Sequence, residues 1–225
     1  MPKEDESLSR SDMMLLLAGE MLQLGPGRRL IAIDGVDGSG KSTFARDLIP
    51  ALKGRPVVTV HVDDFLNAPE IRHRRGRDSA EGFWLDTYDY QALEENVLEP
   101  LSGSGHGLYT PKLSPEHSDR PERHLAPDNA LILIEGMFLH RQEQANRWDY
   151  SIFLDVPFSE TARRMSRRDG SNPDPRHPTM HRYVGGQRLY FENAQPWSRA
   201  TKVVDNTLPD ELRFILRHEA QQRQR

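Results

Sequence analysis

Short apolar runs recur along the chain, and amphipathic segments of helical spacing separate them. The runs consist largely of β-branched and other aliphatic residues and end in polar residues or glycine, which is typical of buried strands. Strands that alternate with helices predict an α/β protein built on a parallel sheet. The predicted strands are residues 30–33, 57–62, 131–134, 150–154 and 201–204.

Helical spacing is clear in several segments. The first predicted helix covers residues 13–24, is capped by Ser11 or Asp12, and ends at the glycine and proline residues 25–27. Its apolar stripe is expected to pack on the sheet rather than against a membrane or a partner. Further helices are predicted at 90–101, after Ser159, and from Thr207 through Leu216, while residues 1–10 and the tail from Glu219 are expected to fray.

The chemically richest stretch joins the first predicted strand to a helix. It is Gly-Val-Asp-Gly-Ser-Gly-Lys-Ser (35–42), which satisfies the P-loop pattern GxxxxGK[ST] in its required strand-loop-helix setting. The glycines let backbone N–H groups face phosphate oxygens, and the start of the helix adds a positive dipole end. Lys41 is predicted to reach the β- and γ-phosphates, and Ser42 to ligate Mg²⁺. The predicted ATP-binding residues are Gly35, Asp37, Gly38, Ser39, Gly40, Lys41, Ser42 and Thr43.

Charge and composition narrow the function further. The 225 residues suit one large α/β domain, and 30 basic against 34 acidic residues give a net charge of −4, so no basic field recruits nucleic acid. Cysteine is absent, which excludes disulfides and thiolate chemistry and suits a reducing cytoplasm. The apolar stretch at 13–18 is too short to span a bilayer, and we find no signal peptide. We therefore expect a cytoplasmic protein without nucleic-acid or membrane partners; a homo-oligomer stays open.

Carboxylates follow two of the predicted strands, at the edge where open α/β sheets bind ligands. Asp63 and Asp64 follow the second strand, and Asp63 is the predicted base that takes a hydroxyl proton beside the γ-phosphate. The alternative is that both are helix caps or solvated turn residues. Glu135 follows the third strand and is predicted to hold Mg²⁺ with Ser42, against the alternative of a structural carboxylate. Residues 205–207 follow the last predicted strand, at the edge where a nucleobase can be held.

Aromatic residues next to carboxylates follow an arginine-rich stretch. The arginines at 72, 74 and 75 are expected in a solvated loop. The residues at 83–89 suit the stacking of a flat ring beside ribose hydroxyls, although a hydrophobic staple before the next helix explains them equally well. The segment 102–129 lacks periodicity and is predicted to be a substrate-covering insertion with a short hairpin near 108–110. The predicted substrate contacts are Asp64, Phe65, Trp84, Asp86, Tyr88, Tyr109 and His117.

The helix after Ser159 carries four arginines on one face. Like charges four residues apart cost about 0.2–0.5 kcal/mol per pair, so a bound anion is the simplest explanation and a solvated basic helix the alternative. With the connector 170–175, the segment 159–178 is predicted to be a lid over the transferred phosphoryl group. Arg164 and Arg167 are the predicted catalytic cations, and Arg163 and Arg168 the predicted nucleotide contacts.

Together these motifs resemble the uridine kinase branch of the P-loop kinases, which also holds phosphoribulokinase and bacterial pantothenate kinase. The resemblance covers residues 29–207 and implies a three-layer α/β/α sandwich with a five-stranded parallel sheet in the P-loop kinase order, MgATP as phosphoryl donor, and Asp63 as the base. The segment after Pro111 differs from that of uridine kinases. The similar segments are the P-loop, His-Val-Asp63-Asp64-Phe, Asp86-Thr-Tyr-Asp89-Tyr, Ile134-Glu135-Gly136, Phe153-Leu-Asp155 with its arginine-rich helix, and Val204-Asp-Asn206.

We therefore expect an ATP-dependent phosphotransferase that acts on a small-molecule hydroxyl, such as the 5′-hydroxyl of uridine or cytidine. One alternative is a kinase of another small alcohol, such as pantothenate, a sugar or nicotinamide riboside. Another is a nucleotide-sensing P-loop protein without a dedicated acceptor. The expected kinase domain covers residues 28–219, between an N-terminal helical extension at 1–27 and a frayed tail at 220–225.

Overall fold

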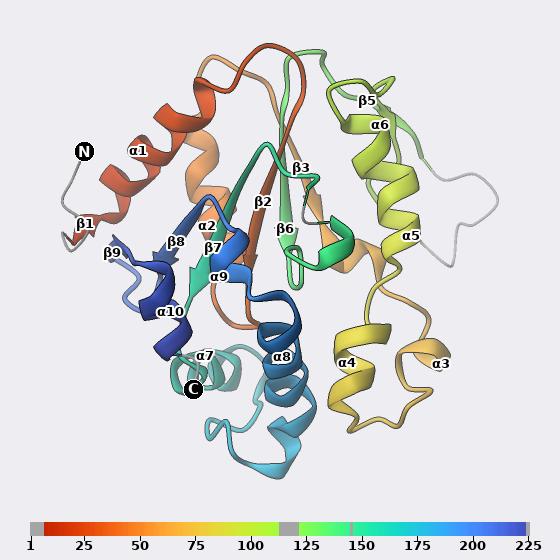
Figure 1. Cartoon of the computed structure of the whole chain (residues 1–225), viewed down its shortest axis with the longest axis vertical. Coiled ribbons are helices and arrows are strands. Elements are labelled where there is room, and N and C mark those ends of the chain that lie inside the picture. Colours follow the sequence, from red (N-terminus) through yellow and green to blue (C-terminus); the bar gives the residue numbers. More distant parts are fainter. Residues whose placement is uncertain (1–6, 113–121, 145, 224–225) are drawn as a thin grey trace.

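A central sheet organises the fold of the protein. The computed structural model describes residues 7–112, 122–144 and 146–223. In this part of the chain the sheet has seven strands in the order β1-β9-β8-β7-β2-β6-β3 (Figure 1). The five predicted strands are all present and mutually parallel, with β2 between β6 and β7, which is the P-loop kinase order. They are β2 (Arg29–Gly35), β3 (Val57–His61), β6 (Leu131–Gly136), β7 (Tyr150–Asp155) and β8 (Lys202–Asp205).

Two antiparallel strands extend the sheet beyond the predicted five. β9 (Glu211–Phe214) pairs with β8, and β1 (Leu8–Ser9) pairs with β9. The prediction of a helix from Thr207 through Leu216 is therefore wrong, and helix α10 (Arg217–Arg223) begins only after β9. Residues 211–214 alternate charged and apolar side chains, which is the period of a strand, and β8 offers them unpaired backbone groups.

Apolar side chains on both faces of the sheet confirm the three-layer sandwich. Ile31 and Ile33 belong to the core cluster under one helical layer, whereas Leu30 and Ala32 belong to the cluster under the other. Because neighbouring residues of a strand point to opposite faces, β2 is covered on both sides. The first layer holds α1 (Arg10–Leu22) and α2 (Lys41–Leu48); the second holds α4 (Ala80–Asp86), α5 (Tyr90–Leu93), α6 (Glu99–Leu101), α8 (His181–Ala194) and α9 (Pro196–Arg199).

Several boundaries differ from prediction by a few residues. α1 is capped by Ser9, whose hydroxyl accepts from the N–H of Asp12 at 3.1 Å, and α7 (Phe158–Asp169) begins before Ser159, without a side-chain cap. The helix predicted at 90–101 is present within those bounds, with a π-helical segment, Glu94–Leu98, between α5 and α6. The remaining short helices are α3 (Pro69–Arg72) and the 3₁₀ turns η1 (Ile49–Ala51), η2 (Val62–Phe65), η5 (Gln142–Gln144) and η6 (Pro178–Met180).

The insertion contains a two-stranded antiparallel sheet, but not the short hairpin predicted near 108–110, because the partner of residues 108–109 lies 15 residues further along the chain. β4 (Leu108–Tyr109) pairs antiparallel with β5 (His124–Leu125). Residues 113–121 between them, including the predicted contact His117, lie outside the described residues. Among the helices of the described ranges, none combines the length and the apolar character that a membrane span requires.

Candidate functional site

The P-loop connects the end of β2 to the first turn of α2. Gly38 and Gly40 have φ angles of 76° and 91°, a left-handed conformation that side chains rarely adopt, so both positions require glycine. Gly40 is the N-cap of α2, and Lys41 is its first residue. The N–H groups of the first turn have no acceptors within the helix, and they are available to an anion at this end. The Lys41 ammonium donates to the carbonyl of Val36 at 3.0 Å, so it lies folded against the loop.

Ser42 and Glu135 meet at the beginning of α2. The Ser42 hydroxyl donates to Glu135 Oε1 at 2.8 Å, which joins the P-loop helix to the end of β6. A hydroxyl and a carboxylate fit Mg²⁺, which typically binds one or two carboxylates and completes its shell with phosphate and water. No group of three or more His, Asp or Glu side chains within the described ranges forms a metal site by itself. The donor set therefore suits a metal that arrives with a nucleotide.

Asp63 lies in the η2 turn directly after β3 and is exposed. The Tyr88 hydroxyl donates to Asp63 Oδ1 at 2.6 Å. Burial and, next, the Asp63 charge raise the pKa of Tyr88 well above its usual value, so Tyr88 stays protonated and continues to donate. The neighbouring Asp64 lies 3.5 Å from the ammonium of Lys112. Phe65 is fully buried and belongs to the core, so it supports this turn rather than facing an acceptor.

Asp86 and Trp84, two of the predicted substrate contacts, are both in contact with arginine side chains. The Asp86 side chain is only 1% exposed and binds Arg74 and Arg75 through separate oxygens. The hydrogen bond from Arg74 contributes most to holding the pKa of Asp86 below its usual value. These contacts overturn the expectation that both arginines are merely solvated. The Arg141 guanidinium stacks on Trp84 at 4.2 Å from the ring centroid, so an acceptor ring would have to displace it there.

The arginines of α7 have different surroundings. Arg163 binds Glu160, and Arg168 binds Asp37 of the P-loop and Asp169. These acidic residues compensate much of the predicted basic face, so a bound anion is not required to explain it. The Arg167 side chain is exposed and makes no hydrogen bond or ion pair with the described residues.

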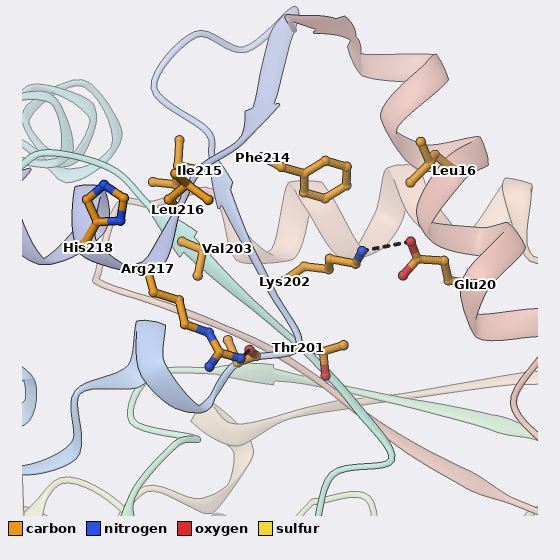
Figure 2. A pocket seen from close by; sticks show the side chains of 11 residues that line it. Leu16, Glu20, Thr201, Lys202, Val203, Phe214, Ile215, Leu216, Arg217 and His218 are labelled. Carbon is orange, nitrogen blue, oxygen red and sulfur yellow. Dashed lines mark hydrogen bonds and ion pairs between the residues drawn. The ribbon is translucent and has the colours of Figure 1, made fainter. Parts of the chain in front are cut away.

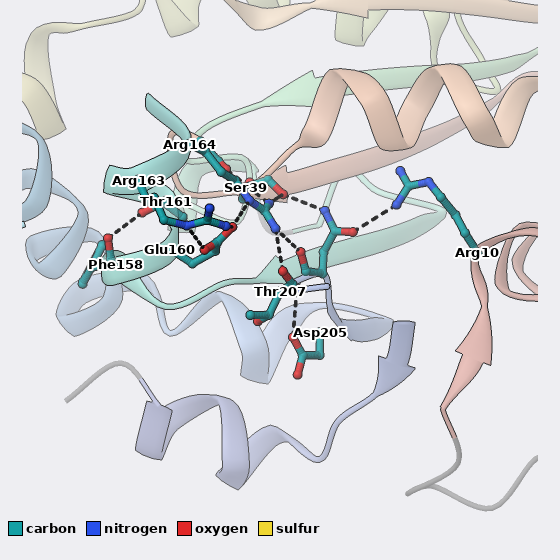
Figure 3. A network of polar contacts seen from close by, with 11 residues as sticks. Arg10, Ser39, Phe158, Glu160, Thr161, Arg163, Arg164, Asp205 and Thr207 are labelled. Carbon is teal, nitrogen blue, oxygen red and sulfur yellow. Dashed lines mark hydrogen bonds and ion pairs between the residues drawn. The ribbon is translucent and has the colours of Figure 1, made fainter. Parts of the chain in front are cut away.

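Arg164 is fixed to the backbone on two sides (Figure 3). Its Nη2 donates to the carbonyls of Asn206 and Thr207 at 2.8 Å each, and its Nη1 to the carbonyl of Ser39 at 3.2 Å. α7 itself lies directly on the P-loop, since a Cβ at Gly38 would stand 2.8 Å from the carbonyl oxygen of Thr161. The predicted lid helix is thus packed against the phosphate-binding loop.

Asn206 supports the P-loop from the other side, a role that its position after the last strand did not reveal. Its side-chain amide donates to the carbonyl of Ser39 at 2.7 Å, and its Oδ1 accepts from Arg10 at 3.2 Å. Arg10 also binds Asp47 at 2.7 Å, so the N-terminal helix reaches this network (Figure 3). Asn206 therefore serves the P-loop backbone in this structure.

A buried polar network beneath the P-loop was not predicted. Asp34, the residue before Gly35, is fully buried and accepts from the Tyr190 hydroxyl and from the backbone N–H of His140. The His140 ring lies 2.7 Å from the same carboxylate oxygen. Burial and, next, the Asp34 charge raise the pKa of Tyr190 well above its usual value. The only signal in the sequence is an acidic residue between the apolar run at 30–33 and the first glycine of the P-loop.

Tyr109 and Thr43 are the two remaining residues that were predicted to belong to the site. Tyr109 is nearly buried in the β4-β5 hairpin, and its ring lies 5.8 Å from that of His124. Thr43 is exposed on the first turn of α2. Neither residue has a contact that assigns it a role.

A cavity of about 680 Å³ lies elsewhere, between α1, β8, β9 and the start of α10 (Figure 2). Leu16 and Phe214 form part of its apolar wall, and Lys202 pairs with Glu20 at 2.9 Å on its polar side. None of the predicted site residues lines this cavity, so it is separate from the candidate site.

Comparisons with known proteins agree with this geometry. The model of the phosphoribulokinase/uridine kinase family matches residues 30–171. Nicotinamide riboside kinase 1 of Mus musculus is 31% identical over 150 residues, which are 66% of this chain and 70% of that protein. Uridine kinase of Schizosaccharomyces pombe is 29% identical over 145 residues, which are 63% of this chain but 32% of that longer protein. A solved structure described as a possible uridine kinase from Bacillus stearothermophilus has a TM-score of 0.66 at 24% identity, covering 85% of this chain and 97% of that one, a likeness of fold alone.

Proposed function

The chain belongs to the phosphoribulokinase/uridine kinase family of P-loop small-molecule kinases, and we propose that it transfers the γ-phosphoryl group of ATP to the 5′-hydroxyl of a nucleoside. The observation that carries this proposal is a series of contacts across the sheet edge. Ser42 of the P-loop helix contacts Glu135, Glu135 contacts His61, and Asp63 follows His61 by two residues. These contacts connect the phosphate-binding loop to the exposed carboxylate of Asp63 at one edge of the sheet.

The donor half of the site holds the phosphates of ATP. The first-turn N–H groups of α2 and the Lys41 ammonium neutralise the β- and γ-phosphate oxygens, once Lys41 leaves the Val36 carbonyl. Ser42 and Glu135 would hold Mg²⁺, which when bound neutralises charge on the β- and γ-phosphates. Arg167 is free to approach the γ-phosphoryl group, because it has no bonded partner in the described part of the chain.

Asp63 acts as the general base in this proposal. One of its oxygens accepts from Tyr88, and the other oxygen takes the proton of the acceptor hydroxyl. As that proton leaves, the hydroxyl oxygen forms a bond to the γ-phosphorus, and the bond from that phosphorus to the β–γ bridging oxygen breaks. The products are the phosphorylated acceptor and ADP, with the proton on Asp63. Tyr88 orients the carboxylate because it remains a donor at neutral pH.

The nucleoside acceptor is proposed from two relatives whose names state a nucleoside substrate, uridine kinase and nicotinamide riboside kinase 1. Pantothenate and sugars remain the competing acceptors within the same chemistry. A nucleotide sensor would bind ATP through the P-loop but would need neither an exposed Asp63 nor a cation such as Arg167.

The test measures ADP formation from MgATP with uridine, cytidine, nicotinamide riboside, pantothenate and simple sugars, and uses Lys41→Ala as the blank. Stimulation by nucleosides alone supports the proposal, and stimulation by another compound replaces the acceptor. Slow hydrolysis that is indifferent to every acceptor favours the sensor. Asp63→Asn should lower kcat by about 10²–10⁴-fold with ATP affinity unchanged, and retained turnover would remove Asp63 as the base.

A further inference from the structure

His61 contacts the carboxylate that is proposed to hold Mg²⁺, and no pattern in the sequence predicted this contact. It is the last residue of β3 and pairs in register with Glu135 of β6. Side chains at matched positions of adjacent parallel strands point to the same face of a sheet. The register therefore places the imidazole directly beside the carboxylate.

The contact is close and acts on one oxygen. His61 Nδ1 lies 2.6 Å from Glu135 Oε1, the oxygen that also accepts from the Ser42 hydroxyl at 2.8 Å. For this contact Nδ1 carries the proton and donates it, since the carboxylate only accepts. Oε1 is thus fixed from two directions, whereas Oε2 has no hydrogen-bond partner among the described residues. The carboxylate is held with its second oxygen free.

Exposure differs sharply between the two partners. The Glu135 side chain is 9% exposed and the His61 side chain 51%. The imidazole therefore stands on the solvent side of the carboxylate and limits the directions in which Glu135 can turn. In metal sites, a hydrogen-bond partner that orients a ligating group typically changes metal affinity 10- to 100-fold when it is removed.

We propose that His61 is a positioning residue that orients Glu135 toward the nucleotide-bound Mg²⁺ and thereby sets the affinity of the site for the metal. This inference rests on the proposed role of Ser42 and Glu135 in the function above. His61 does not touch the reacting atoms in this proposal, since its action passes entirely through the carboxylate. The readout must therefore be the metal affinity, measured separately from turnover.

The experiment measures ADP binding by calorimetry at a series of Mg²⁺ concentrations, which yields the Mg²⁺ affinity of the protein-ADP complex without any turnover. His61→Ala should weaken that affinity 10- to 100-fold, while the ADP affinity measured without Mg²⁺ stays within about twofold of the unmutated protein. His61→Asn should restore most of the loss, because its side-chain N–H is attached at the same carbon position as Nδ1–H in histidine. His218→Ala, which removes an exposed histidine of α10, is the matched control and should change nothing.

The outcomes separate the two proposals. An unchanged Mg²⁺ affinity in His61→Ala, together with a large loss in Glu135→Gln, would overturn the role of His61 and leave the metal site in place. Unchanged Mg²⁺ affinity in Glu135→Gln and Ser42→Ala as well would overturn the proposed metal site itself. Equal loss in His61→Ala and His61→Asn would also contradict the inference, because the donor at Nδ1 would then not be the cause.

Discussion

Arg164 and Arg167 lie one helical turn apart on α7, and we predict that their substitution has opposite consequences. Arg164→Ala should mainly destabilise the protein and weaken ATP binding, because Arg164 joins the P-loop to the segment after β8. Arg167→Ala should leave stability unchanged and lower kcat, because Arg167 is exposed and free of partners among the described residues.

The loss of stability expected for Arg164→Ala can be estimated from the shortest hydrogen bonds of Arg164 to the backbone. Its Nη2 donates to the carbonyls of Asn206 and Thr207 at 2.8 Å each, and its side chain is 20% exposed. Hydrogen bonds of a charged group contribute about 1.5–3 kcal/mol each. The lower value for these two bonds, without the longer ones to the P-loop, predicts a loss of about 3 kcal/mol on substitution by alanine. For a domain of this size that corresponds to a fall in Tm of roughly 6–12 °C.

Thermal unfolding and steady-state kinetics distinguish the two arginines. Arg164→Ala should lower the Tm and raise the KM for ATP about tenfold, since it releases the Ser39 carbonyl of the P-loop. Arg167→Ala should keep the Tm and lose about 10²–10³-fold in kcat, the usual cost of one transition-state donor. Arg164→Lys is the control for charge, and it should restore little, because an ammonium cannot bridge the same carbonyls. Normal melting of Arg164→Ala together with a collapse of kcat would refute this reasoning and identify Arg164 as a mobile catalytic cation.

Three further predictions concern other parts of the site and the fold. Asp86→Asn should cost about 1–2 kcal/mol at pH 7, a figure reduced for the exposure of its arginine partners. Since the pKa of Asp86 is lowered in the folded state, this contribution is complete above the unfolded pKa near 3.9 and is lost as the pH falls through the folded value. The difference in unfolding free energy between the unmutated protein and Asp86→Asn, measured in urea, should therefore be smaller at pH 3 than at pH 7. An equal difference at both pH values would contradict the pairing. Tyr88→Phe should lower kcat about tenfold with little change in the KM for ATP, because it removes the hydroxyl that donates to Asp63 at 2.6 Å. An unchanged kcat would mean that the Tyr88 hydroxyl does not orient Asp63. Gln195 is exposed and has a φ of 45° at the C-cap of α8, a left-handed conformation that favours glycine. Gln195→Gly should therefore raise the free energy of unfolding by about 0.5–1 kcal/mol in chemical denaturation. A lower free energy of unfolding would show that the Gln195 side chain makes a stabilising contact.

The features that the sequence predicted are those encoded by neighbouring residues. The P-loop is a contiguous pattern, and the five parallel strands are contiguous apolar runs, so both were predicted close to their actual places. β9 was missed because its alternation is only four residues long and is followed at once by apolar residues that also suit a helix. Whether these residues form a strand or a helix is decided by pairing with the edge of β8, which is a tertiary contact that the local sequence does not encode.

The roles of the polar side chains were harder to predict, because they depend on partners distant in the sequence. Arg164 and Asn206 were both placed near the nucleotide, but it is their common attachment to the Ser39 carbonyl that gives them a structural task. The arginine-rich stretch conceals the partners of Asp86 for the same reason: a run of charges does not indicate which member turns inward. The contact of His61 with Glu135 follows only from the strand register.

The two antiparallel strands have a consequence for how copies of the protein meet. Had the sheet ended at β8, this four-residue strand would have offered its open backbone groups to another chain, which is a template for aggregation. β9 occupies that edge, and β1, only two residues long, leaves little to pair with beyond it. Within the described residues β3, with five residues, is then the longer of the two edge strands of the sheet. That strand delivers Asp63 to the candidate site, so the edge most exposed to misassembly is also the one that the proposed chemistry needs to keep free.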